Sequence, residues 1–292
     1  MGPAMETIVT GILLGGTYAL VALGLTLQYG VSRIMNLANG ETLVAACFIA
    51  FWLFTSYQVS PLVGILVIAP AAFAINWAIY MLLLRPLVDR AKNQGMLEVD
   101  SILATFGLLF LFQGLMLRGF GGAYTSYSFL AERFEIFGAY YGLNRVVAFA
   151  AAFAIALLLY LFLYWTRYGT ALRAVAVNPA SARLVGIDVA RAAALSFALG
   201  GALTACGGAL LSTFYTFNAS MGVVFTMKAL IIVIMGGVGD VRGAVIAALI
   251  LGIAETAVAR LIDPGLTLAA TYALFTLVLL FRPQGIFGRQ QA

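Results

Sequence analysis

Histidine is absent from the 292 residues of this chain, and its absence excludes several kinds of functional site. Catalysis by histidine, metal ligation by histidine and histidine proton relays all need the imidazole ring. The sequence also has only two cysteines, Cys47 and Cys206, and both fall inside apolar segments. Cysteines in such surroundings are typical of small buried hydrophobic residues, so the sequence predicts no disulfide framework.

A nucleotide-binding loop is missing as well. The pattern G-x-x-x-x-G-K-[ST] needs a lysine for the phosphates of a nucleotide and a hydroxyl for magnesium. The glycine-rich stretch at residues 236–239 continues into Asp240-Val241-Arg242 and supplies neither group. If ATP drives this protein, we expect ATP and magnesium to be bound by another chain. We predict no cofactor, metal or catalytic residue in this one.

Charged residues are scarce, at 9% of the sequence, whereas soluble domains carry about 25%. Hydrophobic residues make up 63% and the mean hydropathy is +1.05. This composition predicts an all-α polytopic membrane protein in contact with lipid. The net charge of +5 does not indicate nucleic-acid binding, because the basic residues are scattered between apolar runs instead of forming one patch.

Nine apolar runs are candidate membrane spans. They lie at about residues 8–28, 34–56, 61–84, 101–117, 144–165, 192–212, 223–238, 243–260 and 265–281. Several are shorter than the roughly 20 residues that a helix needs to cross about 30 Å of hydrocarbon. We therefore expect eight or nine transmembrane segments, one or two of them broken or re-entrant. No long polar linker divides the chain, so residues 1–292 should form a single transmembrane domain.

The basic residues predict the orientation of these spans, because cytoplasmic loops are enriched in lysine and arginine. A basic loop at about residues 166–191 interrupts the apolar pattern, and placing it in the cytoplasm puts the N-terminus outside and the C-terminus in the cytoplasm. Eleven basic residues then lie inside and four outside, with Lys228 left within a span. The inside set is Arg33, Arg85, Arg90, Lys92, Arg167, Arg173, Arg183, Arg191, Arg242, Arg282 and Arg289, and the outside set is Arg118, Arg133, Arg145 and Arg260.

The middle of the basic loop has the pattern of a complete short helix. Asn178 is a favoured N-cap, Pro179 suits the first helical position, and Gly186 suits the end. About two turns are marginal alone in water, so either the ends of the membrane helices or a partner protein must hold this helix. Its candidate contact residues are Asn178, Pro179, Ala182, Arg183, Leu184, Val185 and Gly186.

Polar residues inside apolar runs are the other candidates for function, because each is costly in a membrane. Asn36, Asn39 and Glu41 lie close together, where Asn39 and Glu41 could begin a restarting helix or the break could line a polar passage. Lys228 could extend its ammonium towards the membrane surface. Alternatively, it could pair with Glu41 or Glu255 and so fix the packing of helices. Close packing is also predicted by Gly11 with Gly15 and by Gly239 with Gly243, at four-residue spacing.

Several segments, in their order and spacing, carry a resemblance that covers nearly the whole chain. They are residues 15–26 (GGTYALVALGLT), 36–41 (NLANGE), 173–187, 207–211 (GGALL), 236–239 with 243–246, and 282–288 (RPQGIFG). The chain resembles the integral-membrane permeases of branched-chain amino acid ABC importers, specifically the shorter of their two permease types.

The resemblance implies a multi-pass subunit of the bacterial inner membrane. It implies three kinds of partner: a second, related permease, two cytoplasmic ATPases that bind ATP and magnesium, and a periplasmic substrate-binding protein. The short helix at about residues 179–185 is similar to the coupling helix that docks on the ATPase. Family members often carry histidine where this chain has Asn39. If that position contacts the solute, the substrate need not be a branched-chain amino acid, since relatives serve urea, short amides, other amino acids and aromatic acids.

The mechanism implied is alternating access, in which ATP binding on partner chains rocks the membrane helices. The rival interpretation is a secondary transporter or channel that works alone. It would need intramembrane carboxylates for ion coupling, and only Glu41 and Glu255 qualify. A membrane enzyme is disfavoured because histidine is absent and carboxylates are sparse.

Overall fold

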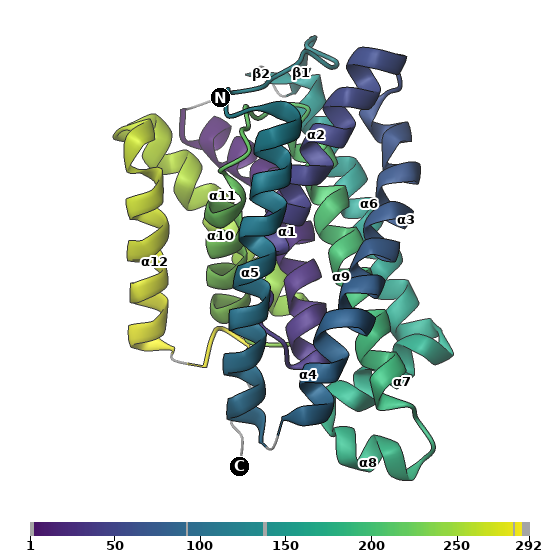
Figure 1. Cartoon of the computed structure of the whole chain (residues 1–292). Coiled ribbons are helices and arrows are strands. Elements are labelled where there is room, and N and C mark those ends of the chain that lie inside the picture. The colour runs from purple at the N-terminus through teal and green to yellow at the C-terminus, as the bar shows by residue number, and fades with distance from the viewer. Residues whose placement is uncertain (1–2, 92, 137–138, 283, 288–292) are drawn as a thin grey trace.

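The protein is a bundle of long helices that run between two opposite ends (Figure 1). A computed structural model describes residues 3–91, 93–136, 139–282 and 284–287. We call the end where α1 begins and a short hairpin lies the upper end, and the end where α4 and α8 lie the lower end, as in Figure 1.

The elements follow the apolar runs of the sequence closely. The helices are α1 (Pro3–Ser32), α2 (Asn39–Tyr57), α3 (Pro61–Ile79), the π-helical turn η1 (Tyr80–Leu84), α4 (Arg85–Arg90), α5 (Gln94–Phe120), α6 (Leu143–Trp165), α7 (Arg167–Val177), α8 (Pro179–Leu184), α9 (Val189–Leu211), α10 (Gly222–Gly236), α11 (Val241–Leu261), the 3₁₀ turn η2 (Pro264–Leu266) and α12 (Thr267–Phe281). Strand β1 (Arg133–Ile136) pairs antiparallel with β2 (Ala139–Gly142) at the upper end.

Side-chain caps set where several helices begin. The side chains of Thr166, Asn178, Asp188 and Asp240 each accept a hydrogen bond from a backbone N–H in the first turn of the helix that follows, at 2.8 to 3.1 Å. Each cap satisfies an N–H that has no partner within its own helix. Short polar residues therefore start α7, α8, α9 and α11 at the places where apolar pattern alone gives only an approximate boundary.

The expectation of eight or nine spans, one or two of them broken or re-entrant, agrees with the structure. Among the described residues, eight helices are long and apolar enough to cross a membrane, and the run through α3, η1 and α4 counts as one of these. The ninth apolar helix, α10, has 15 residues. At 1.5 Å per residue it is about 22 Å long, less than the roughly 30 Å of hydrocarbon. The chain is therefore an all-α polytopic membrane protein.

The irregular region lies where α2 and α10 begin. Thr204 in α9 donates a hydrogen bond to Asn39, the first residue of α2, at 2.9 Å. The hydroxyl of Thr204 also contacts Gly24 of α1 so closely that a Cβ on this glycine would overlap it. Gly24 lies roughly two turns before the end of α1. Asn39 therefore lies beside the interior of α1, and residues 33–38 turn back into the bundle. Next to Asn39, the backbone N–H of Gly40 donates a hydrogen bond to the hydroxyl of Thr226, in the second turn of α10, at 2.8 Å.

Helices α1 and α9 form the centre of the bundle, and glycine lets their backbones approach. A Cβ on Gly24 would overlap the carbonyl oxygen of Gly200, and a Cβ on Gly200 would overlap that of Gly24. Close contact of this kind is the main route to tight helix packing in lipid. By contrast, α3, α5 and α12 lie at the periphery, with large apolar side chains exposed along them, among them Leu66, Leu103 and Leu280.

The other predicted glycine contacts are part right and part wrong. Gly11 and Gly15 pack against the backbone of α11 at Ile253 and Ala248, as their spacing predicted. Gly239 and Gly243 do not lie on one helix, because Gly239 lies in the turn before α11 with a positive φ of 82°. Gly239 nevertheless packs closely, since a Cβ on Gly30 of α1 would lie 3.2 Å from its Cα. Gly243 alone packs against α10, at Gly236.

Replacing Gly200 by valine tests the central contact. The added side chain must displace the backbone of α1, so we expect a loss of about 1–3 kcal/mol in stability, the usual cost of overpacking. Thermal unfolding of the purified protein in detergent measures the loss. Gly107→Val is the matched control, because Gly107 is also in a helix and has nothing within 4 Å of a built Cβ. Equal midpoints for the two variants would contradict the close α1–α9 contact.

Candidate functional site

A buried ion pair joins four helices in the upper half of the bundle. The Nζ of Lys228 on α10 lies 2.8 Å from Oε2 of Glu255 on α11. Tyr18 on α1 accepts a hydrogen bond from Lys228 and donates one to the same carboxylate oxygen, both at 2.9 Å. Thr271 on α12 donates to the other oxygen at 2.6 Å. Both carboxylate oxygens are therefore satisfied, which offsets much of the cost of burying charge.

The structure thus places Lys228 beside Glu255 and not beside Glu41. Its side chain is 8% exposed, so its ammonium is held inside the protein and does not extend to the membrane surface. Tyr18 and Thr271 were not among the residues predicted from sequence. Both lie in helices rich in apolar residues, and a single hydroxyl in such a helix gives no signal of its partner.

A second polar cluster surrounds the start of α2. Asn36 donates to the Gln28 side chain at 3.0 Å, and Gln28 donates to the carbonyl oxygen of Phe197 at 3.1 Å. Asn39 accepts from Thr204, as described above. These contacts show where the polar residues of the re-entrant turn find partners in the absence of water. Gln28 and Thr204 were missed by the sequence analysis because each stands alone in an apolar run.

The Nδ2 of Asn39 has no hydrogen-bond partner among the described residues, and Glu41 is the larger exception within this cluster. Its side chain is fully buried, and neither carboxylate oxygen has a hydrogen-bond partner among the described residues. The carboxylate lies against the Cα of Gly222, where any side chain on that residue would overlap it. Glu41 occupies the first turn of α2, where the helix dipole favours a negative charge. The structure therefore brings Asn36, Asn39 and Glu41 together but leaves Lys228 and Glu255 in a separate network.

The predicted short helix exists at the lower end as α8. Asn178 caps it by accepting from the N–H groups of Ala180 and Ser181 at 3.0 and 3.1 Å, and Gly186 follows it with a φ of 81°. Ala182 is buried, whereas Leu184 and Val185 are 89% and 75% exposed. The helix therefore has one face packed on its own protein and apolar side chains exposed on the other.

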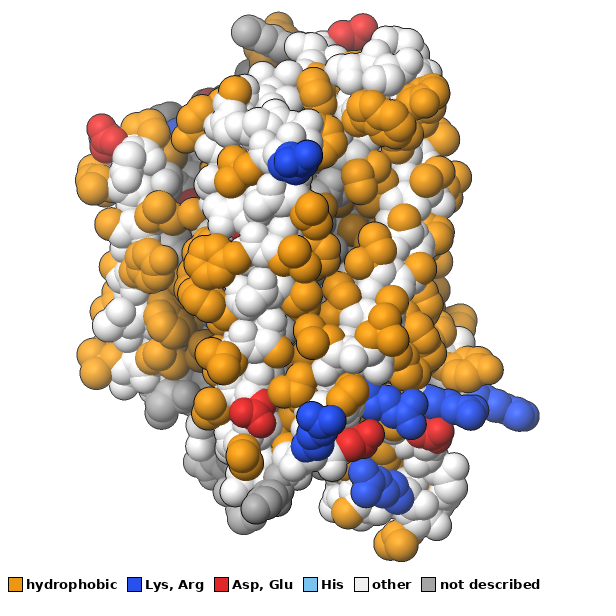
Figure 2. Space-filling model, viewed as in Figure 1, with side chains coloured by type: hydrophobic (Ala, Val, Ile, Leu, Met, Phe, Trp, Pro, Cys, Tyr) orange, Lys and Arg blue, Asp and Glu red, His pale blue; other side chains and the backbone are white. Residues whose placement is uncertain are grey.

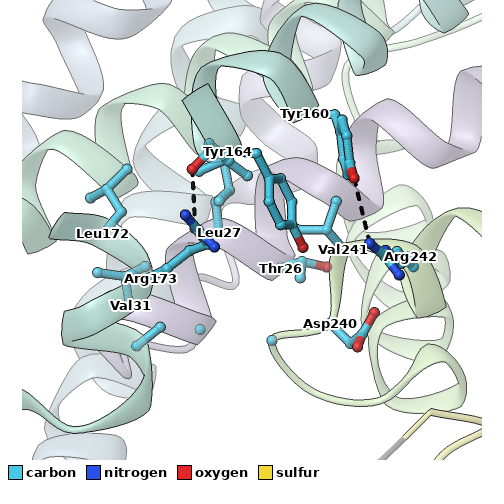
Figure 3. Close-up of a pocket in the computed structure, with 14 residues that line it drawn as sticks. Thr26, Leu27, Val31, Tyr160, Tyr164, Leu172, Arg173, Asp240, Val241 and Arg242 are labelled. Carbon is cyan, nitrogen blue, oxygen red and sulfur yellow. Dashed lines mark hydrogen bonds between the residues drawn. The ribbon is translucent and has the colours of Figure 1, made fainter. Parts of the chain in front are cut away.

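Arginine side chains attach this hairpin of α7 and α8 to the bundle. Arg173 on α7 donates to the carbonyl oxygen of Leu163 on α6 at 3.0 Å, and its guanidinium stacks over the ring of Tyr164 at 4.5 Å. Arg33, just after α1, donates to the carbonyl oxygen of Ala176 at 3.0 Å. Figure 3 shows Arg173 beside Tyr164 in a cavity of about 350 Å³ that also contains Asp240 and Arg242. These contacts tie the hairpin to both α1 and α6.

Comparison with known proteins places this arrangement in a family. The family described as "Branched-chain amino acid transport system / permease component" matches residues 7–282. The chain belongs to this permease family.

Relatives of this permease match it over nearly its full length. The high-affinity branched-chain amino acid transport system permease protein LivH of Escherichia coli (strain K12) is 29% identical, and the match covers 98% of this chain and 96% of LivH. BraD of Pseudomonas aeruginosa, with the same description, is 30% identical with the same coverage. A chain in the structure of PsaBC from Streptococcus pneumoniae in complex with Fab matches with 11% identity and a TM-score of 0.49, covering 98% of this chain and 95% of that one.

Removing one member of the ion pair tests its role in the permease. Lys228→Met leaves the Glu255 carboxylate buried without its cation, and we expect a loss of about 3–5 kcal/mol in stability. The double variant Lys228→Met/Glu255→Gln should regain part of this loss. Thermal unfolding in detergent measures both.

Arg260→Gln is the control for that experiment. Arg260 pairs with Glu6 at 2.7 Å, but both side chains are more than a third exposed, and such pairs contribute about 0–1 kcal/mol. A single Lys228 variant no less stable than Arg260→Gln would contradict the structural role of the buried pair.

Proposed function

We propose that this chain is a permease subunit of a bacterial ABC importer in the inner membrane. Separate ATPase chains that bind ATP and magnesium power it, and a periplasmic binding protein delivers a small polar solute. A second, related permease completes the membrane part. The family match supports a role in transport, and the names of the relatives make an amino acid the first solute to test. The observation that carries the assignment of an ATPase partner is the free apolar face of α8.

The face of α8 has the character of a docking site. Leu184 and Val185 lie at the end of a capped helix and are largely exposed. Figure 2 shows basic side chains gathered at the same end of the molecule. Large apolar side chains exposed in a polar loop indicate a contact with another protein. The other face is fixed to the bundle through Ala182, Arg173 and Arg33. A displacement of α8 by a protein bound to Leu184 and Val185 would therefore be transmitted to α1 and α6 through these contacts.

The basic residues of the same loop also support an orientation of the protein in the membrane. Among the described residues, Arg85, Arg90, Arg167, Arg183 and Arg191 all lie in the segments at the lower end, where Figure 2 shows basic side chains gathered. The excess of basic residues supports a cytoplasmic location for this end. The N-terminus then lies outside and the C-terminus inside, and α8 faces the compartment that contains the ATPases.

A secondary transporter that works alone is the alternative, and Glu41 is the observation that favours it. Its buried carboxylate lacks a hydrogen-bond partner among the described residues, and an unpaired carboxylate in a membrane can serve ion coupling. Glu255 is engaged by Lys228, Tyr18 and Thr271. We prefer the importer because α8 has no use in a transporter without cytoplasmic partners.

Substituting acidic residues for Leu184 and Val185, on the exposed face of α8, tests whether this face binds the ATPase. Leu184→Asp with Val185→Asp should abolish co-purification of the ATPases and reduce ATP-driven uptake in proteoliposomes at least tenfold, because carboxylates cannot enter an apolar contact. The control is Leu261→Asp with Ile262→Asp, a similarly exposed apolar pair at the upper end, which should retain the ATPases. Normal uptake by the α8 variant, or uptake that persists without ATP, would overturn the importer.

Cysteine labelling tests the orientation. The two native cysteines are buried, so they contribute little background to labelling by a membrane-impermeant maleimide. In intact spheroplasts we expect Leu261→Cys to react and Leu184→Cys to react only after the membrane is permeabilised. The reverse pattern would show that the lower end faces outward.

A further inference from the structure

A cavity of about 260 Å³ opens beside the buried ion pair, between α1, α6, α10, α11 and the start of α12. Lys228, Glu255 and Tyr18 line its inner part, whereas Arg145 and Arg260 lie towards the upper end. The cavity is therefore lined by members of two ion pairs, Lys228 with Glu255 and Arg260 with Glu6. Charged residues within membrane segments often mark the pathway of a substrate or ion, and this pair borders a space that a small solute could occupy.

The cavity carries an excess of positive charge. Lys228 is balanced by Glu255, and Arg260 by Glu6 at 2.7 Å. Arg145 forms no ion pair with any acid that the structure describes, and its recorded contact is the ring of Phe214, 5.7 Å from the guanidinium carbon. Among the described residues, the cavity lining therefore has one positive charge that no acid balances. Such a site favours an anion.

Hydrogen-bond donors remain free within this space. A lysine ammonium has three N–H donors, and two of those on Lys228 reach Tyr18 and Glu255. No other residue that the structure describes accepts a hydrogen bond from the third, which is left for a ligand. The guanidinium of Arg145 offers a planar pair of donors that matches the geometry of a carboxylate. Lys228 and Arg145 therefore provide donors on two sides of the same cavity.

Part of the remaining wall is apolar, formed by Leu14, Phe214, Ala259 and the ring of Tyr215. Three threonines, Thr10, Thr256 and Thr267, add hydroxyl groups to the lining. A solute with a carboxylate at one end and a short hydrocarbon side chain at the other would satisfy both kinds of wall. Urea and short amides lack the negative charge that Lys228 and Arg145 would neutralise.

We propose that this cavity binds the carboxylate of the transported solute on its way from the binding protein into the membrane. Lys228 and Arg145 bind the carboxylate, and the apolar walls take the side chain. The proposal rests on the importer function and narrows its substrate class to small carboxylates, amino acids among them. The buried pair then has a second role, because Glu255 and Tyr18 hold the lysine ammonium in position for the solute.

Binding of radiolabelled L-leucine to the full chain in lipid nanodiscs tests the proposal. We expect saturable binding, competed at least tenfold less well by L-leucinamide, which has the same side chain but no carboxylate. Arg145→Gln should weaken leucine binding about tenfold or more, which corresponds to one strong charged hydrogen bond. Arg118→Gln is the matched control, because Arg118 is another exposed arginine near the upper end and does not line the cavity. It should bind leucine as the unchanged protein does.

Three results would overturn the carboxylate site. They are the absence of saturable leucine binding, equal competition by leucinamide, and equal affinities for Arg145→Gln and Arg118→Gln. Gel filtration of each variant identifies any loss of folding. ATP-driven uptake by the complete importer is measured in parallel and reports on the proposed function separately. An importer that takes up urea with ATP would overturn the site alone, whereas leucine binding without any ATP-driven uptake would overturn the importer alone.

Discussion

The ion pair between Lys228 and Glu255 is the interaction on which the architecture of the upper half depends. In a hydrocarbon environment neither charge can be left to water, so each must find partners within the protein. Tyr18 and Thr271 complete the set, and in doing so they bring α1, α10, α11 and α12 together. The short helix α10 is fixed by this network as well as by its apolar surface. A helix of 15 residues that cannot cross the membrane alone needs such an anchor.

The lower end follows a different principle. There, α7 and α8 extend from the bundle, and their residues Leu172, Val175 and Ala182 are buried in its apolar core. Arg173 and Arg33 add hydrogen bonds to backbone carbonyl oxygens, and such charged donors form stronger hydrogen bonds than neutral ones. This arrangement leaves Leu184 and Val185 exposed. The same arginines that favour a cytoplasmic location therefore also connect α8 to the membrane helices.

The start of α2 lies between these two regions. Its polar side chains find partners in α1 and α9, except for the carboxylate of Glu41, which is placed near the first turns of both α2 and α10. Motion of α1 relative to α9 would change the surroundings of this group, because Gln28 and Thr204 come from those two helices. The hydrogen bonds of this region would therefore change if α1 and α9 moved against each other.

Much of this protein followed from sequence alone. The membrane class, the nine apolar helices and the capped helix from Pro179 were predictable because hydrophobic length and cap chemistry are local properties. The partner of Lys228 was left open between Glu41 and Glu255, and Tyr18, Thr271, Gln28 and Thr204 were not found. The packing partner of Gly239, which lies in a turn against Gly30 of α1, was not found either. These features depend on which helices are neighbours and how they are rotated, and only tertiary packing decides that, because in lipid each helix is equally apolar on nearly every side.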